Sequence, residues 1–311
     1  MIPFFVVGPN VTVVVPAVSQ STVPSASRLR RTLDFALHVF WATCEQLGAF
    51  LIGICHQIAD IAGVLSATIF LAFRPQSWTP PVRNVFARQM LFTSVDSIPA
   101  AMRFAAVVGV MGIVQAEMWI DAAGLSTSEV APILWRSVVR EIAPLLACLV
   151  VIGRSGIAIS AELATMHADG EVEVLDSQGV DPMTFLVMPR VISVMLSVFC
   201  LAIIISITIM VTGYLIGSSV GAIRVTWNEY YGEISRNFER GDLVFFTSKT
   251  FVAGGFAGVI CCLEGVRSSG RLTDVPRVAS RAGIRALTAI FAISAILSVV
   301  FYEKLLVFKF G

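Results

Sequence analysis

Charged residues are scarce in this chain, and lysine is nearly absent. Only 14% of the 311 residues are charged, whereas a typical soluble domain has about 25%. The lysines are Lys249, Lys304 and Lys309, so arginine supplies most of the positive charge. A net charge of +1 gives no overall field that would attract nucleic acid. With 56% apolar residues, the composition predicts a polytopic membrane protein.

Residue types that build metal, disulfide and nucleotide sites are also few. His38, His56 and His167 are far apart, and the six cysteines form no CxxC pair, which argues against a metal site or a disulfide framework. No lysine follows a glycine, so the phosphate-binding pattern GxxxxGK[ST] does not occur. No Ser/His/Asp or Cys/His arrangement stands out either. We therefore expect a non-enzymatic chain with no catalytic residue, metal or cofactor of its own.

What the chain has in abundance is long apolar runs. Crossing a bilayer takes ~20 residues, and several runs reach this length. Before them, residues 34–73 are mostly apolar, and their charged residues and histidines lie within a sector of roughly 80° around a helix. Such a stripe favours an amphipathic helix in the membrane interface, although a spanning helix stays open. The stripe consists of Asp34, His38, Glu45, His56 and Asp60. The spans are expected at about residues 97–119, 130–152, 185–220, 243–263 and 284–302.

The predicted fold class is therefore an all-α polytopic membrane protein with an N-terminal interfacial helix and about five transmembrane helices. Residues 1–33 form an extension and linker with no assigned role, and residues 34–311 form the membrane domain. Arginines concentrate before the first span and in residues 265–285, which predicts a cytoplasmic N-terminus. Residues 155–181 are then also cytoplasmic, although they are acidic.

Three charged residues interrupt the second apolar run. Arg136, Arg140 and Glu141 lie within residues 130–152, and charges inside a membrane are costly unless they face protein or a water-filled cavity. Arg136 and Arg140 share one helix face, whereas Glu141 is rotated by about 100° from Arg140. Guanidinium groups bind phosphate through paired hydrogen bonds. These residues either contact an anionic head group in a cavity or pair with another helix.

Several ordered motifs resemble one known family. Residues 140–144 (REIAP) are similar to its R-E-[LI]-x-P motif. Residues 153–156 (GRSG) and 161–166 (AELATM) are similar to its G-R-x-G and A-E-[LI]-G-[TL]-M motifs. Residues 179–182 (GVDP) and the Pro189-Arg190 pair follow at the family's spacing. From about residue 45 to its end, the chain resembles the MlaE/YrbE permeases of Mce-type ABC transporters.

This resemblance implies an MlaE-like permease fold in the inner membrane, working as a homodimer or pseudo-dimer that moves phospholipid or a similar lipid. The implied partners are an ABC ATPase that uses ATP and Mg, a periplasmic MCE-domain protein and often a small STAS-domain protein. The expected lipid-binding residues are Arg140, Glu141, Arg136 and Gln115. The expected ATPase-coupling residues are Arg154, Glu162, Met166, Asp169, Glu173 and Asp176. An alternative is a membrane anchor for an MCE assembly without active transport.

The coupling segment, residues 155–181, also leaves two interpretations open. In one continuous helix its acidic residues would share a face, which would either face water or dock a soluble motor, and Gly170 can interrupt such a helix. The chain also departs from the family here, with residues 171–175 (EVEVL) in place of Q-I-D-A-L and Ala164 in place of a glycine. An arginine-rich segment, residues 268–281, replaces the family's glycine-rich loop. A secondary transporter is disfavoured, because we find no inverted repeat and no ion-coordinating acidic cluster in the spans.

Overall fold

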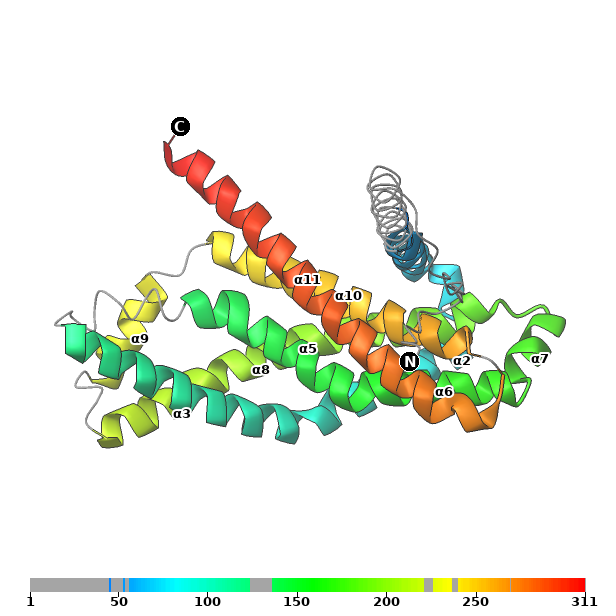
Figure 1. The fold of residues 1–311 in the computed structure, drawn as a ribbon, viewed down its shortest axis with the longest axis horizontal. Helices are drawn as coiled ribbons and strands as arrows, with labels where there is room; N and C mark the ends of the chain where they lie inside the picture. Colours follow the sequence, from blue (N-terminus) through cyan, green and yellow to red (C-terminus); the bar gives the residue numbers. More distant parts are fainter. Residues whose placement is uncertain are drawn as a thin grey trace, which may run out of the picture. The chain divides into compact units, whose positions relative to one another are not determined.

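The computed structural model describes Glu45, Gly53 and residues 56–123, 136–220, 226–236, 240–268 and 270–310. It divides into two compact units, Met1–Gln57 and Ile58–Gly311. Most of residues 1–55 lie outside the described residues, and with them Asp34, His38 and much of the predicted interfacial helix. All regular structure in the described part is helical, which confirms the predicted all-α class (Figure 1).

The first part of the large unit is a series of helices separated by prolines and short turns. A helix covers His56–Ala72, followed by the 3-10 turn η1 (Pro75–Ser77) and by α2 (Pro80–Thr93). Prolines occupy the first positions of η1 and α2, where a missing backbone N–H costs nothing. A second 3-10 turn, η2 (Val95–Ser97), leads into α3 (Ile98–Ala123).

The second helical run is longer than the sequence predicts. It passes through the π-helical turn η3 (Val138–Ile142), α5 (Ala143–Val151), a second π-helical turn η4 (Ile152–Gly156) and α6 (Ile157–Ala168) without a break. The prediction placed the end of the span at residue 152, with a polar segment from residue 155. The helix continues instead, because Arg154 finds polar partners on η2. Gly170, at φ 76°, then separates α6 from α7 (Glu171–Ser177).

The remaining elements alternate between long apolar helices and short polar ones. The turn η5 (Met183–Val187) leads into α8 (Met188–Val220), followed by α9 (Trp227–Arg236) and α10 (Arg240–Val266). The turn η6 (Leu272–Asp274) precedes the last helix, α11 (Val275–Phe310). In Figure 1, α7 lies at one end of this unit and α9 at the other.

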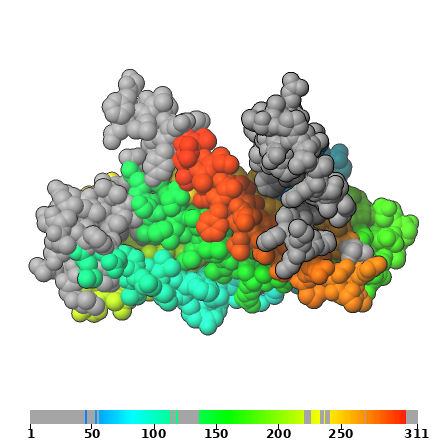
Figure 2. All heavy atoms as spheres, in the orientation of Figure 1, coloured from blue at the N-terminus to red at the C-terminus, as the bar shows by residue number. Residues whose placement is uncertain are grey.

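Five runs in the described part are long and apolar enough to cross a membrane, as predicted. Their limits differ from the predicted ones chiefly at the first and last runs, which begin earlier, and at the second run, which ends later. The runs are Pro80–Gly112, Val138–Ala168, Met183–Ser219, Gly241–Val266 and Leu272–Phe301. In Figure 2, α11 lies across one face of the unit, and it exposes apolar side chains such as Ile284 and Ile296. Apolar side chains on the outside suit a lipid surrounding, so the chain is a multi-pass membrane protein.

Helix α8 forms the centre of the packing, against α2, α3, α5 and α10. Glycines bring two of these helices close to it, since a Cβ at Gly109 of α3 would lie 2.9 Å from the carbonyl oxygen of Ile209. On α10, a Cβ at Gly258 would lie 3.2 Å from the Cα of Val191. Small residues of this kind are how membrane helices gain close contact. Gly112, one turn farther along α3, instead faces open space.

Candidate functional site: an intramembrane charge network and a polar pocket

Both arginines of the second run pair with one carboxylate on α10. The Nε atom of Arg140 lies 2.9 Å from Oδ1 of Asp242, and the Nε atom of Arg136 lies 3.3 Å from Oδ2. Asp242 stands in the first turn of α10, where the helix dipole favours a negative charge. The guanidinium of Arg140 also lies over the ring of Phe245, 5.1 Å from its centre. Arg140 is thereby buried, with only 5% of its surface exposed.

A second ion pair lies beside the same aromatic ring. The ammonium of Lys249 donates to the carboxylate of Glu141 and to Oγ of Ser298, 3.1 Å away. Ser298 in turn donates to Glu141 Oε1 at 2.7 Å. Lys249 is almost completely buried, and its Nζ lies 5.2 Å from the centre of the Phe245 ring. Glu141 thus pairs away from Arg140, as the predicted rotation between them requires.

These five charged residues form what we call the intramembrane charge network: Arg136, Arg140, Glu141, Asp242 and Lys249. Three cations share two carboxylates, so the network carries one positive charge in excess. Its exposed edge consists of Arg136 and Glu141, whose side chains are 38% and 30% exposed. Arg140 pairs with another helix, which is the second of the two roles the sequence left open. A contact with lipid stays a prediction, and the geometry favours Arg136 and Glu141 as the side chains that a ligand can reach.

Sequence reasoning missed part of this network. Asp242 and Lys249 are seven residues apart on α10 and therefore lie on one helix face. The signal was available, because both are charges near or within an apolar run, as Arg140 is. Gln115, the fourth predicted lipid contact, is exposed on α3, and no described contact links it to the network.

The predicted coupling residues lie farther along the same helical run. Arg154 lies in η4, where its NH2 atom is 3.8 Å from Asp96 and its NH1 atom donates to Ser97 Oγ at 3.4 Å. Glu162 of α6 accepts from Arg190 of α8 at 2.9 Å. The sulfur of Met166 lies 3.9 Å from the same guanidinium nitrogen. Arg154, Glu162 and Met166 therefore join α6 and η4 to neighbouring helices.

The other three coupling candidates face outward. Asp169 follows α6, and Glu173 and Asp176 lie on the short helix α7; all three are exposed. Because Gly170 has a left-handed backbone and ends the helical run, these residues do not share one helix with Glu162. Val174 is also 53% exposed, so α7 presents acidic and apolar side chains together. Their role in coupling to an ATPase stays a prediction.

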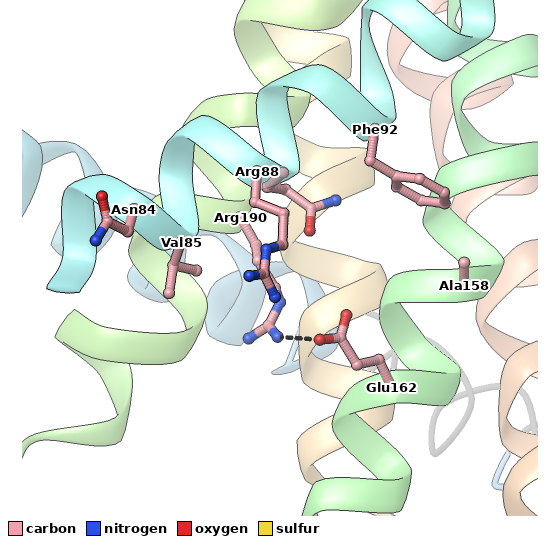
Figure 3. Close-up of a pocket in the computed structure, with 8 residues that line it drawn as sticks. Asn84, Val85, Arg88, Phe92, Ala158, Glu162 and Arg190 are labelled. Carbon is pink, nitrogen blue, oxygen red and sulfur yellow. Dashed lines mark hydrogen bonds and ion pairs between the residues drawn. The ribbon is translucent and has the colours of Figure 1, made fainter.

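A polar pocket lies between α2, α6 and α8, with a volume of about 530 Å³ (Figure 3). We call it the α2 pocket, because most of its lining comes from that helix. Arg190 forms part of its wall and is itself 4% exposed, held by Glu162 and by the carbonyl oxygen of Leu186 at 3.1 Å. The residues that line it are Asn84, Val85, Arg88, Gln89, Phe92, Ala158, Glu162 and Arg190. Among the described residues, no group of three His, Cys, Asp or Glu side chains could hold a metal ion.

Comparison with known proteins agrees with these features. Residues 86–300 match the family model described as Permease MlaE. A Rickettsia prowazekii protein named "Probable ABC transporter permease protein" is 27% identical over 249 residues, covering 79% of this chain and 94% of that protein. A Synechocystis protein of the same description is 28% identical over 215 residues, covering 69% and 81%.

The Arabidopsis thaliana protein TRIGALACTOSYLDIACYLGLYCEROL 1, chloroplastic, is 28% identical over 216 residues, covering 70% of this chain and 61% of that protein. The matched part of the chain includes the intramembrane charge network and every lining residue of the α2 pocket except Asn84 and Val85. Because the model spans well over half of the chain, this protein belongs to the MlaE permease family and is a multi-pass permease of an ABC transporter.

Proposed function

We propose that this chain moves phospholipid or a similar lipid between the inner membrane and the cell envelope, driven by a separate ATPase subunit. The observation that carries the proposal is the intramembrane charge network, whose described members, three cations and two carboxylates, include a partly exposed guanidinium among apolar helices. A chain without polar cargo would have little use for such a costly feature. The Arabidopsis relative is named after a glycolipid, which also supports a lipid cargo.

In this proposal the lipid phosphate binds at Arg136. A phosphate beside Arg136, whose side chain is 38% exposed, would form charge-assisted hydrogen bonds with its guanidinium. Arg140, Asp242 and Lys249 are buried and would hold the exposed residues in place rather than touch the lipid. Nearby apolar side chains on the same run, Ile142 and Leu149, are partly exposed and would contact the acyl chains.

The transporter would be an assembly of several subunits. A second copy of this chain would cover the exposed edge of the network, and an MCE-domain protein would receive or deliver the lipid on the periplasmic side. An ATPase, which binds ATP and Mg, would act on the α6–α7 end of the helical run. A STAS-domain protein is a further expected subunit. This arrangement requires a cytosolic α7 end. The proposed cytoplasmic N-terminus meets that requirement, because two spans precede α7.

The test begins with purification of the native complex through a tag on this chain, followed by mass spectrometry of its subunits and bound lipids. ATP-driven lipid movement is then measured in proteoliposomes made from that complex. We expect Arg136→Gln to lower both bound phospholipid and lipid movement at least severalfold. Arg103→Gln is the matched control, because Arg103 is exposed on α3 and bonds only the Pro99 carbonyl oxygen of its own helix among the described contacts.

Equal lipid occupancy and movement in Arg136→Gln and Arg103→Gln would remove the proposed role of the network. An intact complex that hydrolyses ATP but moves no lipid would instead favour the alternative of a membrane anchor for an MCE assembly.

A further inference from the structure

The α2 pocket contains more positive charge than its own residues neutralise. Arg88 and Arg190 line the pocket with a single carboxylate, that of Glu162. Arg190 donates hydrogen bonds to Glu162 and to the Leu186 carbonyl oxygen. Arg88, in contrast, is exposed and makes no ion pair among the described residues. Figure 3 shows the side chains of Arg88, Arg190 and Glu162 extending toward the same part of the pocket. One guanidinium is therefore available to an anion.

The rest of the lining suits a ligand with a polar head and an apolar part. Asn84 and Gln89 offer amide groups, and Phe92, Val85 and Ala158 supply an apolar wall. A volume of about 530 Å³ falls within the range of roughly 300–1,000 Å³ usual for small-molecule sites. Guanidinium groups favour phosphate because their planar donors match its oxygens in pairs. The chemistry thus indicates a phosphate group attached to an apolar body.

The position of α2 indicates a lipid rather than a soluble phosphate ester. Trp78, two residues before α2, donates its indole N–H to the Ala72 carbonyl oxygen at 2.8 Å. Its ring meets that of Phe86 edge-on at 5.3 Å. Tryptophan with one polar and one apolar side is typical of the membrane interface. Leu91, on the same helix, is 60% exposed, as expected of a lipid-facing residue.

The depth of the pocket agrees with this position. Arg140 and Glu162 lie on one continuous helical run and are 22 residues apart, which corresponds to about 33 Å at 1.5 Å per residue. That separation is close to the ~30 Å thickness of the hydrocarbon core. Because the charge network lies among the apolar helices, a pocket about one core thickness farther along the same run lies at the level of the head groups.

We infer that the α2 pocket binds the phosphate of an anionic membrane lipid, with Arg88 as the direct ligand. Arg190, which Glu162 holds in place, adds a positive charge near the phosphate without binding it directly. The site is distinct from the charge network, and lipid binding there does not require that lipid be the transported cargo. It is therefore tested by equilibrium binding, without ATP.

The experiment titrates the purified, delipidated complex with dioleoyl phosphatidate and counts bound lipids by native mass spectrometry. Dioleoylglycerol, which lacks the phosphate, and inorganic phosphate as a competitor are the comparison ligands. Losing one charge-assisted contact should weaken one binding event about tenfold or more, so we expect this of Arg88→Gln. Ala158→Phe, which fills the pocket without changing a charge, should weaken the same event. Arg83→Gln is the control, because Arg83 is exposed on α2 and does not line the pocket.

Each result supports or overturns the inference. Unchanged phosphatidate binding in Arg88→Gln overturns the inference. This variant suffices for the test because removing the Arg88 guanidinium breaks no described ion pair. Equal binding of dioleoylglycerol would show an apolar groove with no phosphate recognition. Displacement of phosphatidate by inorganic phosphate at similar concentration would show a soluble-anion site. Loss of ATP-driven transport in Arg136→Gln has no bearing on this result, so the two proposals can fail separately.

Discussion

The stability of the protein should fall much more when one partner of the Glu141–Lys249 ion pair is removed than when both are removed. Lys249 is 1% exposed, so Glu141→Leu leaves a buried ammonium with Ser298 as its one remaining acceptor among the described contacts. Breaking a buried pair in this way costs about 3–5 kcal/mol. Lys249→Met leaves the Glu141 carboxylate, which is 30% exposed and still accepts a hydrogen bond from Ser298. We therefore expect a smaller loss in the free energy of unfolding, about 1–3 kcal/mol.

The double variant Glu141→Leu/Lys249→Met should recover most of this loss. Replacing a buried ion pair with apolar residues of similar volume is often neutral, so the double variant should lie within about 1 kcal/mol of the wild type. The assay is the apparent melting temperature of the detergent-solubilised protein. At about 2 °C per kcal/mol for a chain of this size, Glu141→Leu should melt roughly 6–10 °C below the wild type.

An exposed pair provides the control for this cycle. Arg267 and Asp60 are joined at 3.2 Å but are 60% and 52% exposed, and such surface pairs contribute at most about 1 kcal/mol. Arg267→Gln should therefore shift the melting temperature by about 2 °C or less. Additive losses in the double variant, with no recovery, would refute the reasoning, because they would mean that the two charges do not interact in the folded protein.

Other predictions concern the backbone and the coupling segment. Gly109→Ala should destabilise the protein, because its Cβ would lie 2.9 Å from a backbone oxygen of α8, whereas Gly112→Ala should be neutral or slightly stabilising; their melting temperatures check this. Gly170→Ala should lower the free energy of unfolding by about 1–2 kcal/mol, measured in the same assay, since its left-handed φ of 76° strains an alanine. Glu173→Lys, exposed on α7, should leave the fold and the bound lipid unchanged but lower ATP-driven lipid movement severalfold; unaltered movement would exclude a coupling role for α7.

The helical class and the number of spans could be predicted because both depend on local patterns. Long apolar runs and the minimum length of a membrane span suffice for that purpose. The limits of the runs could not be predicted as well. The second span was expected to end at residue 152, yet the contacts of Arg154 with Asp96 and Ser97 allow the helix to continue. Those contacts join residues 57 or 58 positions apart, and periodicity within one helix cannot reveal them.

The site was predicted only in part for the same reason. The shared face of Arg136 and Arg140 follows from helical spacing and is correct, since both reach Asp242. Asp242 itself is about one hundred residues away, so its partnership depends on how α10 packs. Arg88 was overlooked because an exposed arginine before an apolar run is usually a simple interface charge. Only the approach of α2 to α6 and α8 shows that it lines a pocket.

The two π-helical turns that flank α5 have a mechanical consequence. Each holds one residue more than an ordinary turn of helix, so converting one into an α-turn rotates everything beyond it by about 100° and moves it about 1.5 Å along the axis. Arg140 and Glu141 lie in the first of these turns, and Arg154 lies in the second. Twisting the helix at Arg154 therefore reorients the charges at the other end of α5, while α5 itself stays rigid.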